Sequence, residues 1–476
     1  MESIALSLIA HTNVGKTTLA RTLLRRDVGT VLDQAHVTEV AEAWPLMETE
    51  KGRLLLWDTP GFGDSARLLK RLRGEGKAVG WFLHEVWDRL TDRPLWCSQE
   101  ALRNVREDAD VVLYLVNAAE HPEEAGYVAL ELELLGWLDR PVLVLLNQTG
   151  HAEDDARLTA QWAEHCRQWK HVRGLLPLDA FTRCWVQETA LLERVSELLP
   201  AEKRAAMADL ISAWNARSLA VLENAVGALA TVFATTAADR ETVPSGIAGG
   251  ALGTGRKHAQ SALIERLEQR FATLISELVE AHGLQGRAAA SVRERIEDFA
   301  VSGLVPVGEK EGALWGAILS GAATGVTAEV LSGGLTFGAG ALLGALAGAF
   351  GGAGLIKGLR LVKGGAKPAV RWESEFLDDL VCRGLLTYLA VAQFGRGQGD
   401  FDQAALDAEQ AAWATAVEAC VTRERGRLAA LWKAALDEGT EAAWSDLAEV
   451  TDRLLRQVLV ARHPDAAGLL RLAPEA

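Results

Sequence analysis

The sequence predicts an α/β domain with a mainly parallel sheet, followed by an all-α domain that contains a glycine-rich apolar helical hairpin. Two observations lead to this fold class. Over residues 1–200, apolar runs of strand length alternate with helical patterns, which is typical of a parallel sheet buried on both faces. Helical patterns then fill residues 201–310 and 363–476, and residues 311–362 between them are nearly uncharged and rich in Gly.

The composition limits the classes of function. At 476 residues the chain is long enough for two or more domains, and 49% apolar with 24% charged residues is typical of a folded protein. A formal net charge of −15 without an extended basic cluster argues against nucleic acid as a partner. The five Cys lack C-x-x-C spacing and are expected to be reduced thiols of a cytosolic protein. The N-terminus enters the first strand directly, so we expect no signal peptide.

The first chemical motif lies between a predicted strand and a predicted helix. An apolar run, Ile4–Ile9, precedes the sequence A-H-T-N-V-G-K-T-T at Ala10–Thr18, and a helical pattern follows at Leu19–Leu24. A glycine-containing loop at a helix start points backbone N–H groups at a phosphate, which predicts a P-loop that binds a nucleoside triphosphate. Lys16 can reach the β and γ oxygens, and the Thr17 hydroxyl can ligate Mg²⁺. The predicted phosphate-binding residues are Asn13, Val14, Gly15, Lys16, Thr17 and Thr18.

A second motif ends the apolar strand Leu54–Trp57. Its sequence, D-T-P-G, runs from Asp58 to Gly61. An Asp at this point holds Mg²⁺, usually through water, and the Gly amide can donate a hydrogen bond to the γ-phosphate.

The P-loop departs from its usual pattern at Ala10, which replaces the first Gly and is tolerable only if its φ stays negative.

A third motif is expected to contact the base. The apolar run Val142–Leu146 leads into N-Q-T-G, where guanine-binding proteins carry N-K-x-D. Asn147 fits that pattern, and Gln148 takes the place of the Lys whose stem covers the base. These two residues are the predicted base-binding residues. Gly150 replaces the Asp that reads guanine, so ATP stays open as an alternative to GTP.

Residues 65–109 form an insertion that is rich in Trp and charged residues. Helical spacing predicts two amphipathic helices packed on the domain, with the Trp side chains in its core. The insertion follows Gly61 directly, so it would also move with the nucleotide state, as a switch region does. Packing and switching do not exclude each other.

The glycine-rich segment predicts either lipid contact or very close helix packing. Its glycines recur every four residues and place small side chains on one helix face, where backbones can approach closely. The repeating positions are Gly340, Gly344, Gly348 and Gly352. About 20 residues cross a bilayer, so the first arm of the hairpin is marginal in length and the second is sufficient. Burial inside a helical bundle, or storage there with release to lipid, is the alternative.

Two further features belong to the C-terminal half. A cationic flank after the hairpin suits an anionic cytoplasmic leaflet and consists of Lys357, Arg360, Lys363, Lys367 and Arg371. The helical regions show no catalytic constellation. Their expected core anchors are Trp372, Trp413, Trp432 and Trp444.

The motifs together resemble the TrmE–Era-like branch of small GTPases over the first ~190 residues, where the P-loop usually reads G-x-P-N-V-G-K-S. The resemblance implies GTP as substrate, Mg²⁺ as cofactor, and K⁺ near Asn13 as a candidate. Thr38 is expected, on spacing, to be the first-switch Thr that completes the Mg²⁺ shell, with Thr30 as a rival. Phe62 stands where Ras-like enzymes carry a water-orienting Gln, which implies slow intrinsic turnover that depends on a cation, a partner or dimerisation. The whole chain is similar to a bacterial group of unknown role that joins this GTPase domain to a C-terminal domain with a glycine-rich apolar segment.

These expectations define one hypothesis and two alternatives. The chain is expected to be a cytoplasmic GTP hydrolase whose nucleotide state controls a helical domain that associates with the inner (cytoplasmic) membrane. The expected partner is this membrane or a membrane protein, with a homo-oligomer as a further expectation. The expected catalytic residues are Lys16, Thr38 and Gly61, and the expected Mg²⁺ ligands are Thr17, Thr38 and Asp58. There are two alternatives. The first is a structural or pore-forming membrane protein that assembles when nucleotide is bound, and the second is an ATPase of the same fold.

Overall fold

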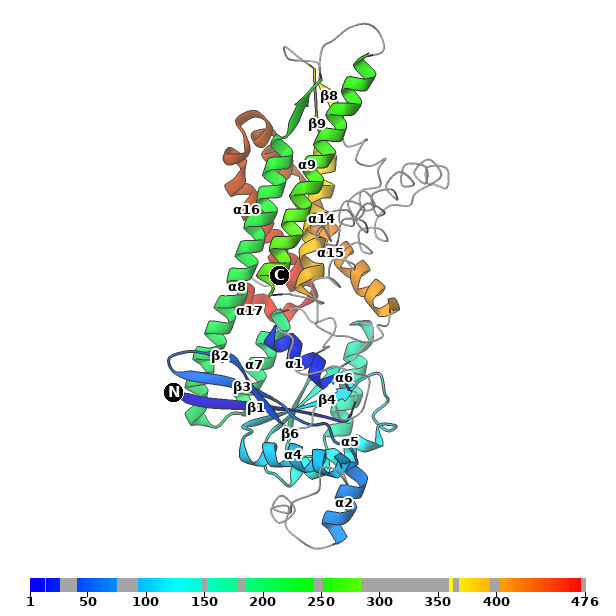
Figure 1. The fold of residues 1–476 in the computed structure, drawn as a ribbon, viewed down its shortest axis with the longest axis vertical. Helices are drawn as coiled ribbons and strands as arrows, with labels where there is room; N and C mark the ends of the chain where they lie inside the picture. Colours follow the sequence, from blue (N-terminus) through cyan, green and yellow to red (C-terminus); the bar gives the residue numbers. More distant parts are fainter. Residues whose placement is uncertain are drawn as a thin grey trace, which may run out of the picture. The chain divides into compact units, whose positions relative to one another are not determined.

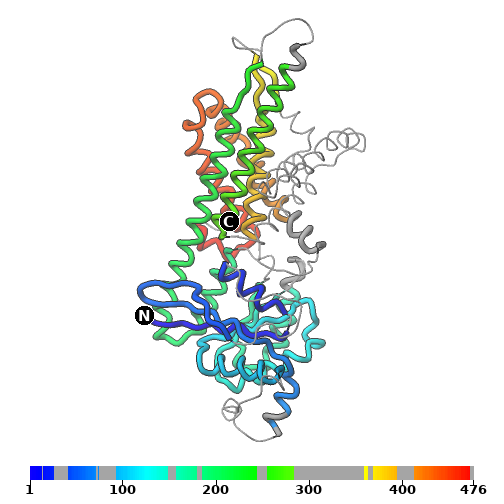
Figure 2. The backbone as a smooth tube through the Cα atoms, viewed as in Figure 1, coloured from blue at the N-terminus to red at the C-terminus, as the bar shows by residue number. Residues whose placement is uncertain are grey.

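The computed structural model describes residues 1–12, 14–25, 41–74, 93–147, 152–178, 185–243, 251–283, 359–362, 368–393 and 403–471. The chain divides into two units (Figure 1, Figure 2). The first unit contains residues 1–220, 393–409 and 465–476, and the second contains residues 221–392 and 410–464. Of the glycine-rich hairpin expected at residues 311–362, the structure describes only residues 359–362.

A six-stranded sheet forms the centre of the first unit, in the order β2-β3-β1-β4-β5-β6. The parallel strands are β1 (Glu2–Ala10), β3 (Gly52–Asp58), β4 (Val111–Asn117), β5 (Val142–Asn147) and β6 (Val172–Pro177). The edge strand β2 (Glu42–Glu48) runs antiparallel to β3, and its register shifts between Pro45 and Met47. The mainly parallel sheet confirms the predicted α/β fold, and the apolar runs identified in the sequence lie in its central strands.

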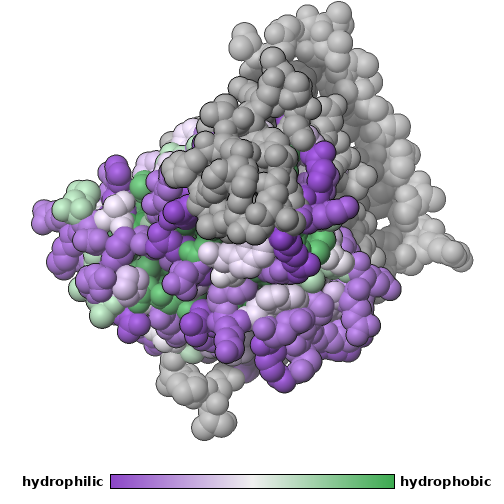
Figure 3. Space-filling model, turned by 90° about the horizontal axis from the view of Figure 1, so that it is seen from below, coloured by the Kyte–Doolittle hydropathy of each residue, from purple (hydrophilic) through white to green (hydrophobic). Residues whose placement is uncertain are grey.

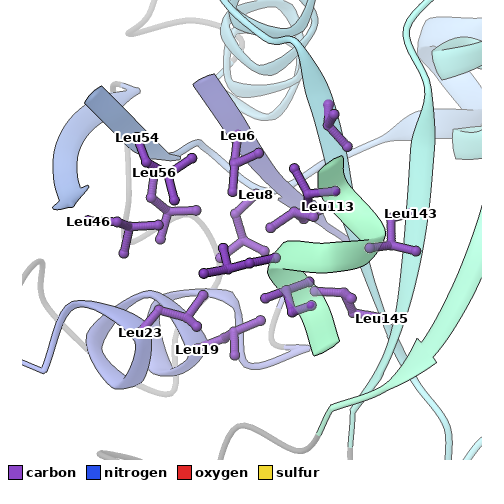
Figure 4. Close-up of a cluster of buried hydrophobic side chains, with 14 of the residues drawn as sticks. Leu6, Leu8, Leu19, Leu23, Leu46, Leu54, Leu56, Leu113, Leu143 and Leu145 are labelled. Atoms are coloured by element: carbon purple, nitrogen blue, oxygen red, sulfur yellow. The ribbon is translucent and has the colours of Figure 1, made fainter. Parts of the chain in front are cut away.

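Helices cover both faces of this sheet. One face packs against α1 (Lys16–Leu24), α7 (Val186–Leu198) and the first part of α8 (Ala201–Ala238). Figure 4 shows leucines of the strands meeting Leu19 and Leu23 of α1. The other face packs against α2 (Ser65–Gly74), α4 (Arg93–Glu107), α5 (Gly126–Gly136) and α6 (Ala152–Cys166). Because β4 is buried on both sides, its residues from Val111 to Val116 are all apolar.

The helices α2 and α4 lie in the Trp-rich insertion, and residues 75–92 between them are outside the described part of the chain. Leu68 of α2 and Leu102 of α4 are fully buried in the core on their side of the sheet, while Trp96 is only partly buried. The molecular surface seen in Figure 3 is predominantly hydrophilic over the described residues. These two helices therefore bury an apolar stripe and expose charge, as amphipathic helices do.

Long helices build the second unit. They are the remainder of α8, α9 (Ala251–Ala281), α14 (Ser374–Ala392), most of α15 (Gln403–Glu438), and α16 (Thr440–Arg462). The short η1 (Pro464–Ala466) and α17 (Ala467–Leu470) follow in the sequence, and α17 belongs to the first unit. Of the predicted Trp anchors, Trp372, Trp413 and Trp432 are buried. The prediction for Trp444 is wrong, because this side chain is 40% exposed and lies on the surface of α8, where its Nε1 donates to Thr231 Oγ1 at 3.0 Å.

A small antiparallel sheet was not foreseen in the region expected to be helical. It has the order β7-β9-β8 and consists of β7 (Arg240–Thr242), β8 (Leu359–Val362) and β9 (Ala369–Trp372). Its strands have only three or four residues each, too few for an alternating pattern to stand out. Arg360 and Arg371 of the expected cationic flank therefore lie on strands, while Lys357, Lys363 and Lys367 lie outside the described residues.

Candidate nucleotide site

The phosphate loop begins at the end of β1 and ends where α1 starts. Gly15 has a φ of 94°, and its carbonyl accepts the N–H of Leu19 at 3.0 Å to open the helix. A Cβ at Gly15 would lie 2.7 Å from the Nδ2 of Asn147, so both the backbone conformation and the space require glycine. Ala10 is the last residue of β1 and is not among the described residues with positive φ, which meets the condition for Ala at this position.

The side chains of Lys16, Thr17 and Asp58 come together at the ends of β1 and β3. Lys16 Nζ lies 2.6 Å from Asp58 Oδ1, and both side chains are almost fully buried. The Thr17 hydroxyl donates to Asp58 Oδ2 at 3.2 Å. These strands are parallel neighbours, so residues that follow their carboxyl ends meet at one edge of the sheet. The structure thus gathers the three residues that the first two motifs contributed.

This donor set fits Mg²⁺. A carboxylate and a hydroxyl are hard oxygen ligands, and Mg²⁺ binds proteins through one or two carboxylates while phosphates and waters fill its other positions. The Asp58 carboxylate already holds one cation, the Lys16 ammonium, in this structure. Within the described residues, no group of three or more His, Cys, Asp or Glu could hold a metal by itself, and the described cysteines form no disulfide. Thr38, the third expected ligand, lies outside that part of the chain.

The D-x-x-G segment is attached to the phosphate loop through its backbone. Phe62 N–H donates to the carbonyl of Ala10 at 3.1 Å, and His11 pairs with Phe62 in an isolated parallel bridge. A Cβ on Gly61 would lie only 3.4 Å from that same carbonyl. The Phe62 side chain is fully buried in the core. A displacement at Gly61 would therefore reach both the phosphate loop and the core beneath it, and the Phe62 ring cannot orient water.

A fully buried carboxylate connects this segment to its surroundings, and the motifs did not reveal it. Glu131 of α5 is fully buried. Its Oε1 lies 2.6 Å from His11 Nδ1 and accepts the Ser65 hydroxyl at 2.8 Å, and its Oε2 accepts the Tyr114 hydroxyl at 2.7 Å. His11 is in the phosphate loop and Ser65 begins α2. Glu131 thus joins the phosphate loop, the first residue of α2 and the centre of the sheet.

Burial and the contact with Glu131 shift the pKa values of His11 and Tyr114. Burial disfavours the charged imidazole of His11, but the hydrogen bond to Glu131 and the charges of Glu131 and Glu120 outweigh it, so the pKa of His11 is raised. Burial, followed by the charge of Glu131, raises the pKa of Tyr114 well above its usual range. The His11 ring also stacks on Tyr127, with 4.3 Å between ring centroids. The contact with Glu131 therefore favours the charged form of the His11 imidazole.

Of the two residues expected at the base, the structure describes Asn147. Asn147 is fully buried, and its Nδ2 donates to the carbonyl of Val14 at 2.8 Å, so it attaches the end of β5 to the phosphate loop. Thr18 is buried within α1. Asn13, with the K⁺ expected beside it, and Gln148 lie outside the described residues.

Comparison with known families separates the two halves of the chain. A family model described as a domain of unknown function (DUF3482) matches residues 170–458, more than half of the chain. The chain belongs to this family. A model described as 50S ribosome-binding GTPase matches residues 6–148, which contain the phosphate loop, the D-x-x-G segment and Asn147. This DUF3482 protein therefore has an N-terminal P-loop GTPase domain, which binds GTP, and a C-terminal DUF3482 domain.

Individual relatives of this DUF3482 protein are distant. GTPase Era of Campylobacter jejuni is 21% identical over 200 residues, which are 42% of this chain and 57% of that protein. The chain thus spans little more than half of the length of this curated relative. Among solved structures, Era in complex with MgGDPNP and nucleotides 1506–1542 of 16S ribosomal RNA is 19% identical over 42% of this chain and 58% of that one, with a TM-score of 0.32. A variant of Aquifex aeolicus Era bound to GDP and AlF4⁻ is 20% identical with the same coverage and TM-score.

Proposed function

We propose that this protein is a GTP hydrolase whose nucleotide state controls a helical domain associated with the cytoplasmic membrane. The observation that carries the first half is the buried contact of Lys16 and Thr17 with Asp58 at the carboxyl ends of β1 and β3. Phosphoryl transfer needs positioning and charge stabilisation more than covalent help, and a lysine with two oxygen ligands for a metal supplies both.

Each residue of the site has a defined task in this proposal. Lys16 and the backbone amides from Asn13 to Thr17 hold the phosphates, and Gly61 donates its amide to the γ-phosphate. Thr17 and Asp58 hold Mg²⁺, with Thr38 as the third ligand in the triphosphate state. When bound, Mg²⁺ neutralises charge that develops on the phosphate oxygens. Phe62 stands where Ras-like enzymes carry a water-orienting Gln, and its ring is buried, which supports a slow intrinsic turnover.

The switching half of the proposal rests on the path from Gly61 to α2. Phe62 N–H donates to the carbonyl of Ala10, and α2 begins three residues after Phe62 at Ser65, whose hydroxyl donates to Glu131. A movement of the D-x-x-G segment on hydrolysis would change the position of α2, as in other nucleotide switches.

The membrane half rests on the sequence of residues 311–362. Within the described residues, one helix is long and apolar enough to cross a bilayer, namely α8, with a mean hydropathy of 1.5 over its most apolar window. Half of that window is buried inside the protein, which is equally typical of a helix in a soluble core. The support for membrane association therefore comes from the uncharged glycine-rich segment and its cationic flank.

GTP turnover by the full chain tests the first half. Lys16→Ala is expected to abolish hydrolysis, while Lys51→Ala, which changes a lysine 70% exposed and paired with Asp209, is expected to leave it unchanged. Turnover by the wild-type chain equal to that of Lys16→Ala would refute the proposal.

Competition of labelled GTP by ATP tests whether the site prefers guanine over adenine, because Asn147 is bound to Val14 and no carboxylate follows it in the motif. Equal displacement by the two nucleotides would favour the ATPase alternative.

Sedimentation of the full chain with liposomes tests the second half. Samples with a GTP analogue, with GDP or without nucleotide are compared, and the proposal expects more protein in the lipid pellet in one nucleotide state than in the other. Equal sedimentation in all samples would separate lipid binding from the nucleotide switch. Sedimentation in none of them would remove the membrane from the proposed function.

A further inference from the structure

The small sheet of the second unit has one face in the core and one face outside. Val370 and Trp372 of β9 and Leu359 of β8 are buried. Residues of the opposite parity face away from that core, because successive side chains of a strand point to opposite sides. On this outer side, Arg240 and Arg360 are exposed and Arg371 is partly exposed.

The three arginines form one row across the sheet. Arg371 on the central strand β9 is in register with Arg240 of β7 and with Arg360 of β8. Directly opposite residues have Cβ atoms about 5 Å apart, and like charges in such pairs are destabilising. Among the described residues, none of the three forms an ion pair. The sheet therefore holds three guanidinium groups whose mutual repulsion an anion would relieve.

The two acidic residues that flank Arg240 already have partners. Asp239 and Glu241 flank Arg240 in sequence, but both pair with Arg266 of α9, with N–O distances of 3.0 Å and 2.9 Å. Asp239 also pairs with Arg270 at 2.8 Å. Glu373, just after β9, forms no ion pair within the described residues. Asp239 and Glu241 thus neutralise a different pair of arginines and, among the described residues, form no ion pair with Arg240.

Two stretches of the sequence next to the row contain no acidic residue. Residues 242–264 and 330–372 contain no Asp or Glu, although the whole chain has a net charge of −15. The basic residues in these two stretches are Arg256, Lys257, Lys357, Arg360, Lys363, Lys367 and Arg371. Figure 1 shows β8 and β9 at one end of α8 and α9, so Arg360 and Arg371 lie at one end of the second unit. An acidic protein with such an end has a local site for anions.

We infer that the outer face of the β7-β9-β8 sheet, with Arg240, Arg360 and Arg371, binds the phosphates of anionic membrane lipids. Guanidinium groups match phosphate oxygens in a two-pronged geometry that an ammonium cannot reproduce. The sequence favours lipid over other phosphates, because the uncharged residues 330–356 lead directly into this sheet. The inference rests on the proposed function for its membrane and adds the surface that recognises the leaflet. Arg240, more than 100 positions before the cationic flank, joins it through strand pairing.

A variant of the full chain in which all three arginines become Gln tests this assignment. Binding is measured by co-sedimentation with vesicles of phosphatidylcholine, with and without phosphatidylglycerol. Each basic residue near an anionic leaflet contributes about 1 kcal/mol, or about 5-fold in affinity, so the variant is expected to bind phosphatidylglycerol vesicles on the order of 100-fold more weakly. A matched control changes Arg53, Arg167 and Arg194, exposed arginines of the first unit, to Gln and alters the net charge equally. Its binding is expected to equal that of the wild-type chain.

Two further arms identify the source of the phosphate. Inorganic phosphate at constant ionic strength is expected to leave the vesicles bound, and complete displacement would assign the face to a soluble phosphate and overturn the lipid assignment. Single-stranded RNA that binds the wild-type chain while the vesicles do not would overturn it as well. A thermal melt provides a measure without membrane, since removal of the repulsion is expected to leave the variant at least as stable as the wild-type chain.

The outcomes separate this inference from the proposed function. If the triple variant binds phosphatidylglycerol vesicles as tightly as the wild-type chain, the arginine face is wrong while membrane association stands. If the wild-type chain binds the vesicles but hydrolyses no GTP, and the triple variant does not bind the vesicles, the proposed GTP hydrolysis is wrong and the arginine face stands. If the wild-type chain binds no vesicles, both the face and the membrane half of the proposed function are wrong. GTP turnover of the triple variant is expected to be that of the wild-type chain.

Discussion

Glu131 is the residue whose replacement best tests the architecture around the phosphate loop. The change Glu131→Gln keeps the size of the side chain and removes its charge. The carboxylate accepts hydrogen bonds from Ser65 and Tyr114 and contacts His11 Nδ1, whereas an amide has one accepting oxygen and an NH₂ that donates. At least one buried donor therefore loses its acceptor and faces another donor.

The expected cost follows from these contacts. Hydrogen bonds to charged groups contribute about 1.5–3 kcal/mol each, and a buried donor without a partner costs about 1–3 kcal/mol. In Glu131→Gln, an NH₂ group replaces one carboxylate oxygen and its hydrogen bonds are lost, while the hydrogen bonds to the remaining oxygen are weakened. The first unit should therefore lose about 2–4 kcal/mol of stability. Ser65→Ala removes one of the contacts and should cost about 1–2 kcal/mol.

The measurement must report the first unit alone. Urea unfolding of the full chain, followed by hydrogen–deuterium exchange in peptides of β4 and α5, does so. Glu164→Gln is the matched control, because this glutamate of α6 is 67% exposed and pairs with Arg167 on the surface, so its loss should change stability by less than about 0.5 kcal/mol. If Glu131→Gln and Glu164→Gln unfold at the same urea concentration, the assigned role of the buried carboxylate is refuted.

Three further predictions concern single residues. Gly15→Ala should abolish GTP binding in calorimetry, because its φ of 94° and the Asn147 amide exclude a methyl group; retained binding would contradict the described loop. Gly384→Ala should lower the stability of the second unit by about 1–3 kcal/mol in a thermal melt, since a Cβ there would lie 2.7 Å from an aromatic ring of α8; an unchanged melt would show that the helices can separate at no cost. In a pH series, the difference in unfolding free energy between the wild-type chain and His11→Gln should be largest below pH 6.5, the ordinary pKa of histidine. It should fall as the pH rises through the raised pKa of His11. A difference that grows with pH would mean that burial, not Glu131, governs this histidine.

The parts of the site that the sequence predicted are local. Lys16 and Thr17 follow an apolar strand and open a helix, and Asp58 ends the neighbouring strand, so their meeting follows from the order of elements along the chain. Parallel strands bring such ends together in any sheet of this type. This is why three residues from two motifs could be assigned without a structure.

The parts that it missed depend on contacts between distant residues. Glu131 is 120 positions from His11, and in sequence it is one of two glutamates in a leucine-rich helix. Glu133, two positions later, is partly exposed and pairs with Arg73, and nothing in the local pattern distinguishes the two. The row of arginines depends in the same way on the register of strands of three or four residues. Trp444 was assigned to the core because its size favours burial, but it covers the outside of α8.

The edge strand β2 has a consequence for self-association. Pro45 has no N–H, and the irregular register that follows it interrupts the row of backbone groups that an edge strand would offer to a second chain. Charged residues at both ends of the strand, Glu42 and Glu48, add a further obstacle. Sheet extension across two copies is therefore disfavoured on this border, and pairing through strands would have to use another edge, such as β6.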